Sequence, residues 1–250
     1  MTARFAGRVA LVTGGGTGIG RATALAFARE GATVAVAGRS PDALAQAVQL
    51  IETEGGQASA VTADVTQAED VARLVDTAVA RHGGLHIAFN NAGVLVPGLI
   101  AEIDEPTWST VLTTNLTGVW LSMKYEIAHM RSHGGGVIVN TSSIPTTMVP
   151  GLGAYGASKA GVSALTRAAA REHLGDGIRL NAICPGPVDT VMSRAPGETD
   201  SDRGARMQTQ HPMGRVADAG EIAAGVLWLA SPESSYTVGH DLVIDGGATA

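Results

Sequence analysis

Cysteine is almost absent from this sequence, since Cys184 is the only one among 250 residues. A single thiol excludes an intrachain disulfide, and it argues against a metal centre built from cysteine. Cys184 stands in the segment NAICPG, at the end of an apolar run. This position favours a buried, inert thiol over a reactive one.

Long apolar runs and clusters of basic residues are also missing. No stretch approaches about 18 uninterrupted apolar residues, so we expect no membrane-spanning helix. The opening residues, MTARFAGRVALVTGG, reach glycine before they form an apolar stretch long enough for a signal peptide. We therefore expect a cytoplasmic protein. The net charge of −6 argues against a nucleic-acid surface, although a small anionic cofactor needs only a local positive site.

Glycine and apolar residues are abundant: the chain has 33 glycines and is 45% hydrophobic, against 16% charged. This composition is typical of a folded protein with a buried core. Short β-branched runs alternate with longer segments rich in Ala and Leu. The short runs are apolar throughout, which indicates strands that are buried on both faces of a parallel sheet. We predict an α/β protein with a doubly wound parallel sheet of about seven strands and helices on both faces.

The same periodicity gives approximate ranges for these elements. We expect strands at 8–14, 33–38, 58–64, 85–91, 136–143, 178–184 and 241–246. We expect helices at 18–30, 42–55, 67–82, about 105–132, 154–174 and 219–230. No linker is long or polar enough to divide the chain, so residues 1–250 are expected to form one domain.

Residues 185–217 break this rhythm, because they are rich in Pro, Gly and charge and lack a clear period. Loops of this length in a compact domain are usually functional or disordered. The segment follows the sixth expected strand, so we interpret it as a substrate lid. An oligomer contact and an unstructured loop are the alternatives.

A glycine-rich turn, TGGGTGIG at 13–20, follows the first expected strand and opens directly into a helix. In that context, glycines let backbone N–H groups approach a pyrophosphate at the positive end of the helix. The pattern glycines are Gly14, Gly18 and Gly20, and Gly16, Thr17 and Ile19 complete the candidate cradle. The alternative is a tight connection with no ligand.

The end of the second expected strand bears on which dinucleotide would bind. NAD-binding units usually offer an acid here to the ribose 2′-OH, but residues 31–41 contain none. Instead Arg39 follows the strand, with Ser40 beside it, and a guanidinium can pair with a 2′-phosphate. We therefore favour NADP(H) over NAD(H). Alternatively, Arg39 is a solvated charge or stacks on adenine whichever cofactor is bound.

Six sequence blocks together resemble the short-chain dehydrogenase/reductase family over essentially the whole chain. They are TGGGTGIG, ADV at 63–65, NNAG at 90–93, YGASK at 155–159, PGPVDT at 185–190 and VIDGG at 243–247. The resemblance implies a single Rossmann-type domain that binds a dinucleotide and transfers hydride between an alcohol and a carbonyl. It also implies a homotetramer, with a dimer as the fallback. The apolar character of the final helix, 219–230, and of the last strand suggests buried subunit contacts.

The resemblance assigns further residues to the cofactor. It implies that Asp64 binds the adenine amino group, with Val65 beside it, and that residues 91–93 lie along the adenosine and ribose. It implies a clamp on the nicotinamide carboxamide. The cofactor candidates in these two groups are Asp64, Val65, Asn91, Ala92 and Gly93, then Pro185, Gly186, Val188 and Thr190. A turn that stabilises the strand end is the structural alternative for NNAG.

Tyr155 and Lys159 are four residues apart, so on a helix they share one face. The resemblance makes them the reactive pair, in which the tyrosine hydroxyl transfers a proton to or from the substrate oxygen. It also implies that Lys159 binds the nicotinamide ribose. We hypothesise that the neighbouring ammonium and an oxidised nicotinamide lower the pKa of Tyr155.

The resemblance also implies a serine that polarises the substrate oxygen and an asparagine in a proton relay. The strand register favours Ser143 as the serine, while the spacing to Tyr155 favours Ser142. Asn115 is the relay candidate, and a helix-kinking Asn bonded to a nearby carbonyl is its structural alternative.

The expected activity is interconversion of an alcohol and a ketone or aldehyde with NADP(H). Candidate residues lining the substrate cleft are Val94, Val96, Pro145, Met148, Met192 and Met207, and the scattered histidines predict no metal site. Alternatives are a non-catalytic cofactor sensor, a lyase or epimerase, an NAD-dependent alcohol dehydrogenase and a 3-oxoacyl-carrier-protein reductase. The last would prefer a basic rim, for which Arg194, Arg203 and Arg206 are offset by Glu198, Asp200 and Asp202.

Overall fold

A computed structural model describes residues 3–144, 150–194 and 197–250. Seven strands form one parallel sheet in the order β3-β2-β1-β4-β5-β6-β7. They are β1 (Val9–Thr13), β2 (Thr33–Gly38), β3 (Gln57–Thr62), β4 (Ile87–Asn90), β5 (Gly136–Thr141), β6 (Ile178–Pro185) and β7 (Asp241–Ile244). The predicted doubly wound α/β fold is therefore confirmed, with each strand inside or within two residues of its expected range.

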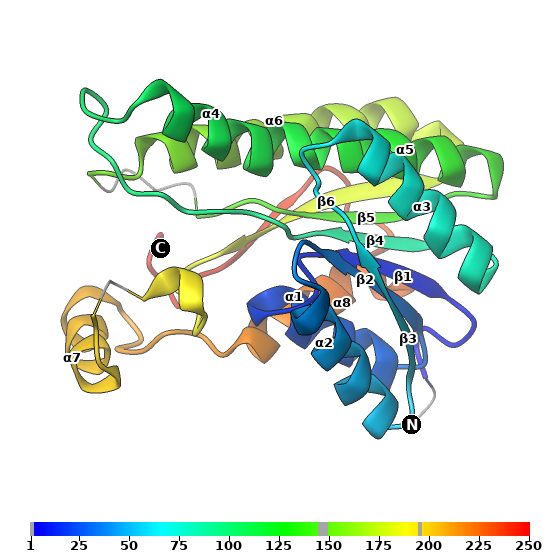
Figure 1. The fold of residues 1–250 in the computed structure, drawn as a ribbon, viewed down its shortest axis with the longest axis horizontal. Coiled ribbons are helices and arrows are strands. Elements are labelled where there is room, and N and C mark those ends of the chain that lie inside the picture. Colours follow the sequence, from blue (N-terminus) through cyan, green and yellow to red (C-terminus); the bar gives the residue numbers. More distant parts are fainter. Residues whose placement is uncertain (1–2, 145–149, 195–196) are drawn as a thin grey trace.

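Helices cover both faces of the sheet (Figure 1). One face carries α1 (Gly18–Arg29), α2 (Pro41–Thr53) and α8 (Ala219–Ala230), and the other carries α3 (Ala68–His82), α5 (Gly118–Ser132) and α6 (Gly153–His173). Each layer encloses its own apolar core: Phe27 and Val226 lie in the first, and Met130 and Val162 in the second. These helices have one apolar stripe each, because only one side of them meets the sheet.

The expected helix at 105–132 is interrupted. It consists of α4 (Glu105–Leu112), a π-helical turn at Thr113–Thr117 and α5. The expected lid also differs from a loop, since α7 (Asp200–Gln210) lies within it. A capping box between Thr199 and Asp202 starts α7, because each side chain satisfies a backbone N–H of the other residue.

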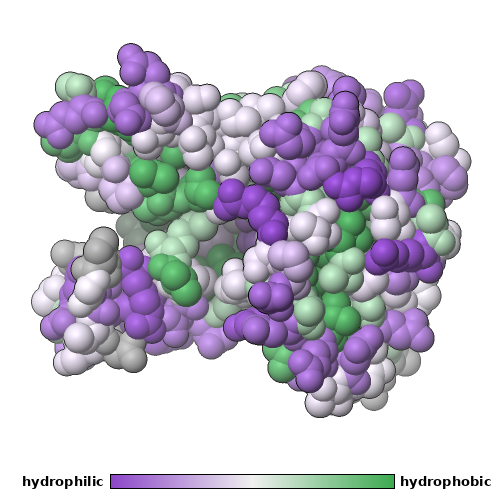
Figure 2. Space-filling model, in the orientation of Figure 1, coloured by the Kyte–Doolittle hydropathy of each residue, from purple (hydrophilic) through white to green (hydrophobic). Residues whose placement is uncertain are grey.

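The carboxyl ends of the strands all lie at one edge of the sheet, since every strand pair is parallel. The strand order changes direction between β1 and β4, which is the point where open α/β sheets bind ligands. Figure 2 shows the molecule hollowed at this end, between the layer of α4 and α6 and the segment of α7. Among the exposed apolar side chains are Leu99, Ile100, Val191 and Met192, from two of the segments near this hollow.

No helix in the described ranges is long and apolar enough to cross a membrane. The same ranges contain no cluster of three His, Cys, Asp or Glu side chains that would hold a metal ion.

Candidate active site

The turn between β1 and α1 leaves the positive end of α1 open. Gly14 and Gly18 adopt φ values of 65° and 50°, and a Cβ on Gly20 would lie 2.2 Å from the Gly14 carbonyl oxygen. Thr17 is the N-cap of α1, but no described side chain accepts from its first N–H groups, and its first turn contains no acid. Side chains do cap α2, α4, α7 and α8. This open end of α1 fits the pyrophosphate of a dinucleotide.

Two other candidate cofactor segments meet this turn. A Cβ on Gly14 would lie 2.8 Å from Asn91 Nδ2, and one on Gly18 would lie 3.0 Å from Thr190 Cγ2. The Asn91 backbone N–H donates to Thr13 Oγ1 at 3.0 Å, and Asn91 Nδ2 donates to the Thr13 carbonyl at 3.2 Å. Asn91 therefore ties the end of β4 to the end of β1, as the structural alternative for NNAG expects.

Other candidate cofactor residues lie at the ends of β2, β3 and β6. Arg39 is exposed after β2, and Ser40 is the N-cap of α2, where its hydroxyl accepts from the Ala43 N–H at 3.4 Å. The Asp64 carboxylate accepts from the Thr66 N–H at 2.9 Å, which shapes the turn after β3. Further members of the set are Gly16, Ile19 and Ala92 near the glycine turn, Val65 after β3, and Pro185, Gly186 and Val188 after β6.

Tyr155 and Lys159 lie one turn apart near the start of α6. Lys159 Nζ is 5.8 Å from the centroid of the Tyr155 ring. Lys159 is 4% exposed, and its Nζ donates to the Thr141 carbonyl at 2.7 Å. Because Thr141 ends β5, the sheet fixes the ammonium beneath the phenol ring.

Burial shifts the pKa values of Lys159 and Tyr155 in opposite directions from their usual values. Desolvation lowers the pKa of Lys159 to about 8. Burial raises the pKa of Tyr155, and a hydrogen bond with the Ser143 side chain only partly opposes that effect. In the protein alone, burial outweighs any lowering by Lys159, which faces the ring and donates to a carbonyl instead of the phenol oxygen. The hypothesised lowering by an oxidised nicotinamide stays a prediction.

The two candidate serines point to different partners. The Ser143 side chain is hydrogen-bonded to Tyr155. The Ser142 hydroxyl donates to the Lys159 carbonyl at 2.9 Å and lies 2.8 Å from the Ser163 hydroxyl. Ser142 therefore links the end of β5 to the backbone of α6, whereas the side chain of Ser143 is available to the hydroxyl of Tyr155.

Asn115 occupies the π-helical turn between α4 and α5 and is fully buried. Its amide pairs with the main chain of Val94: Oδ1 accepts from the Val94 N–H and Nδ2 donates to the Val94 carbonyl, both at 2.8 Å. Nδ2 also donates to Ser158 Oγ at 3.1 Å. These contacts match the structural alternative for Asn115, a helix distortion bonded to a nearby carbonyl. A Cβ on Gly93 would lie 3.1 Å from Asn115 Oδ1 and 3.7 Å from Lys159 Nζ. Asn115 and Lys159 of the reactive pair therefore both adjoin Gly93.

The candidate substrate-lining residues are distributed unevenly. Val94 and Val96 are half-buried in the loop after β4, and Met192 is 46% exposed. Met207 is 4% exposed on α7. Pro145 and Met148 lie outside the described residues. In the loop after β4, the Gly98 N–H donates to the Gly151 carbonyl at 2.8 Å.

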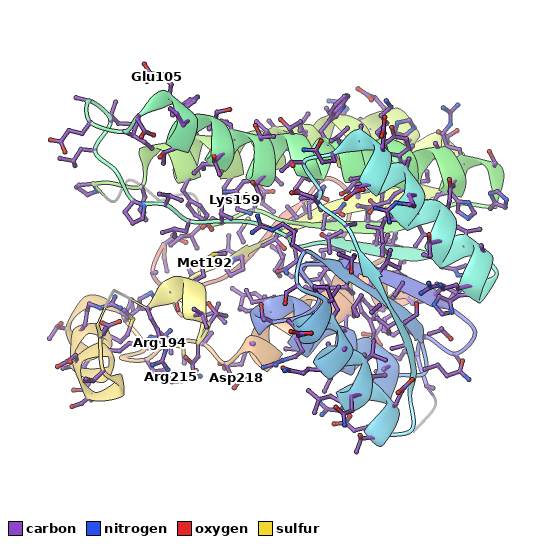
Figure 3. The ribbon with its side chains drawn as sticks, in the orientation of Figure 1. Glu105, Lys159, Met192, Arg194, Arg215 and Asp218 are labelled. Carbon is purple, nitrogen blue, oxygen red and sulfur yellow. The ribbon has the colours of Figure 1, made fainter. Side chains whose placement is uncertain are left out.

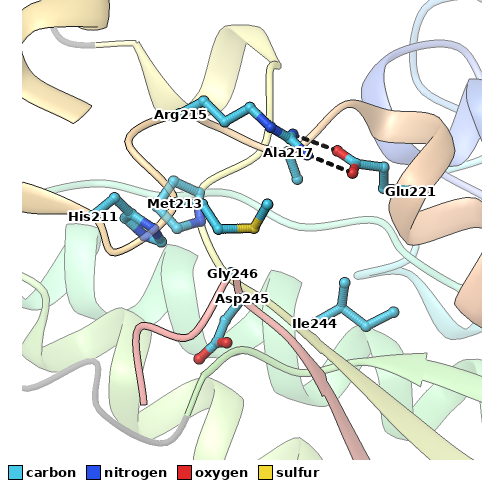
Figure 4. A pocket seen from close by; sticks show the side chains of 9 residues that line it. His211, Met213, Arg215, Ala217, Glu221, Ile244, Asp245 and Gly246 are labelled. Carbon is cyan, nitrogen blue, oxygen red and sulfur yellow. Dashed lines mark hydrogen bonds and ion pairs between the residues drawn. The ribbon is translucent and has the colours of Figure 1, made fainter. Parts of the chain in front are cut away.

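A cavity adjoins the start of α6, and Ser143, Gly153, Gly156 and Lys159 are among its lining residues. Figure 3 shows Lys159 on the sheet side of the hollow and Met192 on the side of the expected lid. Figure 4 shows a second, smaller cavity between His211–Ala217 and residues 244–246. The reactive pair does not line this second cavity, in which Arg215 pairs with Glu221 at 2.7 Å.

Arg203 is a residue near the site to which the sequence assigned no structural role. Arg203 is 4% exposed and donates to the Val188 carbonyl at 3.0 Å. The sequence showed it only as a possible rim charge, because a buried arginine on a polar segment leaves no periodic signal. The Thr199–Asp202 capping pair was the one available signal for its helix.

Comparisons with known proteins agree with this geometry. The family profile described as enoyl-(acyl carrier protein) reductase matches residues 14–249. A cyclohexanol dehydrogenase of Acinetobacter sp. (strain SE19) is 38% identical over 254 residues, which covers 100% of this chain and 98% of the relative. A 3-oxoacyl-[acyl-carrier-protein] reductase of Thermotoga maritima is 36% identical over 245 residues, covering 98% of each chain.

Solved structures share the fold as well as the sequence. The crystal structure of a short-chain type dehydrogenase/reductase from Mycobacterium marinum superposes with a TM-score of 0.94 at 36% identity, covering 100% of this chain and 98% of that one. The relatives act as dehydrogenases or reductases, which agrees with a nicotinamide-dependent oxidoreductase acting on CH–OH and C=O groups. The chain belongs to the short-chain dehydrogenase/reductase family.

Proposed function

We propose that this enzyme interconverts a secondary alcohol and its ketone with NADP(H), and that Tyr155 moves the proton. The observation that carries the proposal is the hydrogen bond between Tyr155 and Ser143 above the buried Lys159 ammonium. A proton donor, a second hydroxyl and a fixed positive charge thereby meet at one point. This set supports acid/base catalysis at a carbonyl oxygen.

In the proposed mechanism each side chain has one task. The Ser143 hydroxyl donates to the substrate oxygen and holds it beside Tyr155. Tyr155 donates its proton to that oxygen during reduction and accepts it back during oxidation. The Lys159 ammonium, anchored on the Thr141 carbonyl, stabilises the phenolate that remains. Bound NADP(H) supplies or accepts the hydride.

Residues near the pair are proposed to position the cofactor and the proton path. The glycine turn and the open end of α1 bind the pyrophosphate, and Val188 and Thr190 hold the nicotinamide end. Asn115 holds the main chain of Val94 in place, and we propose that it also joins Lys159 to solvent through a water. Asp64 and Arg39 are proposed to bind the adenosine.

The preference for NADP(H) rests on the end of β2. Gly38 closes the strand without a carboxylate, and the exposed Arg39 follows it. Because Ser40 already accepts from α2, Arg39 is the charged group available to a 2′-phosphate at this turn. NAD(H) remains the alternative, with Arg39 then stacked on adenine or solvated.

Substrate class is proposed from the relatives and the charges of the lid. The cyclohexanol dehydrogenase and the carrier-protein reductase are about equally similar to this chain, so identity does not decide between them. The three arginines that could form a basic rim for a carrier protein are all engaged: Arg203 is buried, Arg206 pairs with Glu198 at 2.6 Å, and Arg194 lies 3.7 Å from Asp189. We therefore propose a small, largely apolar alcohol or ketone, such as a cyclic one, taken up between residues 185–217 and the start of α6.

Titration of NADPH and NADH against the wild type and Arg39→Ala tests the cofactor assignment. We expect NADPH to bind more tightly, by at least about tenfold, and Arg39→Ala to remove that preference. Arg81→Ala, which removes an exposed arginine from the last turn of α3, is the matched control. NADH binding as tightly as NADPH would make the enzyme an NAD-dependent dehydrogenase. A stoichiometric change in nicotinamide absorbance with cyclohexanone would exclude a lyase or epimerase.

A further inference from the structure

Helix α7 contacts the rest of the protein through a narrow face. Of its side chains that the structure describes, Arg203 and Met207 are buried, each 4% exposed, and the others are exposed or half-buried. The two are four residues apart and so lie on the same side of the helix. Figure 1 shows α7 set apart from both helical layers. The docked position of α7 therefore depends on these two side chains.

The Arg203 guanidinium contacts one short segment, Val188–Ser193. Its Nη2 donates to the Val188 carbonyl at 3.0 Å and to Ser193 Oγ at 2.5 Å. Its Nη1 pairs with Asp189 Oδ1 at 2.5 Å. The Ser193 hydroxyl in turn donates to the Val188 carbonyl, so the segment is cross-linked through the arginine.

This segment contacts the glycine turn. Thr190 lies between the residues that Arg203 holds, and a Cβ on Gly18 would be 3.0 Å from Thr190 Cγ2. The same segment is also bonded to the chain that follows α7, because the Asp189 N–H donates to the Ala217 carbonyl at 2.8 Å. The conformation of Thr190 is therefore set from α7 and from the chain that follows α7.

Burying a guanidinium is costly unless a countercharge and hydrogen bonds compensate for it. Here the countercharge, Asp189, has a side chain that is 56% exposed and sits at the rim. We propose that Arg203 is a positioning residue that couples α7 to Val188–Ser193. Docking of α7 and binding of the nicotinamide end by this segment are then thermodynamically coupled. The inference rests on the proposed function, because it takes Val188 and Thr190 as cofactor contacts.

The chain offers a matched control on the same helix. Arg206 is one turn from Arg203, but it pairs with Glu198, at 2.6 and 2.9 Å, and not with Val188–Ser193. Arg203→Gln and Arg206→Gln remove the same charge from α7. Only the first removes the link to the cofactor segment. Asp189→Asn tests the same link from its other side.

Hydrogen exchange on the cofactor-free protein gives the first readout. We expect Arg203→Gln to speed amide exchange in both 199–211 and 186–193, because one contact orders the two segments. We expect Arg206→Gln to leave exchange in 186–193 unchanged. Unchanged exchange in 186–193 for Arg203→Gln would overturn the inference. If Arg203→Gln does not fold, Arg203→Lys and Asp189→Asn decide in the same way, since each weakens the contact without removing the whole side chain.

Fluorescence titration with NADPH gives the second readout. We expect Arg203→Gln to weaken NADPH binding by at least about tenfold, and Arg206→Gln to weaken it by less than about twofold. The double variant Asp189→Asn/Arg203→Gln should bind only slightly more weakly than Arg203→Gln, because both changes break the same close contact and the Asp189 carboxylate otherwise has, within the described residues, only a 3.7 Å pair with Arg194. Additive losses would overturn the coupling. Failure of the wild type to bind either nucleotide would instead reject the proposed function, while the exchange comparison would still test the α7 link.

Discussion

Lys159 carries its ammonium in a buried position, where desolvation lowers its pKa from 10.5 to about 8. For a base whose pKa falls on folding, the charged form is less stable in the folded protein than in the unfolded chain. The cost is fully present below pH 8, fades between pH 8 and 10.5, and is absent above that range. A residue proposed to serve the reaction thus lowers the stability of the fold at neutral pH.

Lys159→Met should therefore stabilise the enzyme at pH 7 by up to about 3 kcal/mol, less the hydrogen bond to the Thr141 carbonyl. The same variant should lose at least about 100-fold in activity. Denaturant unfolding at pH 7 and at pH 10.5 measures the first effect, and the gain should vanish at the higher pH. Equal stability of the two proteins at pH 7 would contradict the burial cost.

Glu126 is another buried charge-bearing side chain, 1% exposed on α5 where that helix contacts β4. Its Oε2 accepts from Asn90 Nδ2 at 2.9 Å, and Asn90 Nδ2 also donates to Asn140 Oδ1 at 3.0 Å. Within the described ranges, Glu126 Oε1 and Asn90 Oδ1 have no hydrogen-bond partner. Desolvation raises the pKa of Glu126 from 4.5 to about 7. Because the folded protein holds this proton more tightly, stability falls as pH rises from 4.5 to 7.

Glu126→Gln should remove that pH-dependent loss. Its amide keeps the acceptor for Asn90 Nδ2 and cannot ionise. We expect the variant to be more stable than the wild type at pH 8 by up to about 3 kcal/mol, and similar to it at pH 4.5. Urea unfolding at the two pH values measures the difference. A gain of the same size at both pH values would show that packing, and not ionisation, is responsible.

At the scale of elements, Arg179 of β6 organises the end of α8. Its Nη2 donates to the carbonyls of Leu229 and Ser231, at 3.1 and 3.0 Å, and its Nη1 donates to that of Ser234 at 3.1 Å. These carbonyls lie in the last turn of α8 and just beyond it, where no intrahelical donor is available. One side chain therefore joins the sheet to a helix terminus.

Arg179→Met should lower the free energy of unfolding by about 2–4 kcal/mol, because three carbonyls lose a charged donor together and keep only neutral hydroxyl or amide donors. Arg179→Lys should recover only part of this loss, since a single ammonium does not reproduce the forked contact. Chemical denaturation measures both, with the exposed Arg171→Met on α6 as control. A loss below about 0.5 kcal/mol for Arg179→Met would show that water replaces the guanidinium.

Elements were predictable where a residue pattern alone specifies them. The seven strands and six main helices follow from apolar periodicity, because each buries a stripe against the sheet. The π-helical turn was not predictable, since it depends on the pairing of Asn115 with Val94, 21 residues away. Helix α7 was missed because its buried face is formed by Arg203 and Met207, which give no apolar stripe. The pKa direction of Tyr155 likewise depends on burial, which sequence spacing does not show.

At the scale of the whole molecule, the sheet has two ends, and β7 forms one of them. Its described pairing is with β6, so its outer edge is open, and Val243 on it is 38% exposed. Unpaired apolar edge strands are usually covered in native proteins. The outer faces of α4 and α5 also carry uncovered apolar side chains, Trp108 and Trp120, which are 41% and 46% exposed. From these surfaces we propose that the enzyme is a homotetramer, with a dimer as the alternative, because covering both would require two kinds of subunit contact.

Sedimentation velocity should therefore give a species of four 25.3 kDa chains. Val243→Lys should shift the enzyme to a smaller species, because a charge on the open edge of β7 opposes pairing of two edges. Leu50→Lys is the control, since Leu50 is 43% exposed on α2, away from both surfaces. A wild-type dimer that Val243→Lys leaves intact would place the contact on α4 and α5, and Trp120→Lys should then dissociate it. A wild-type monomer at micromolar concentration would mean that neither surface is covered by a second copy, and the active site would have to be complete within one chain.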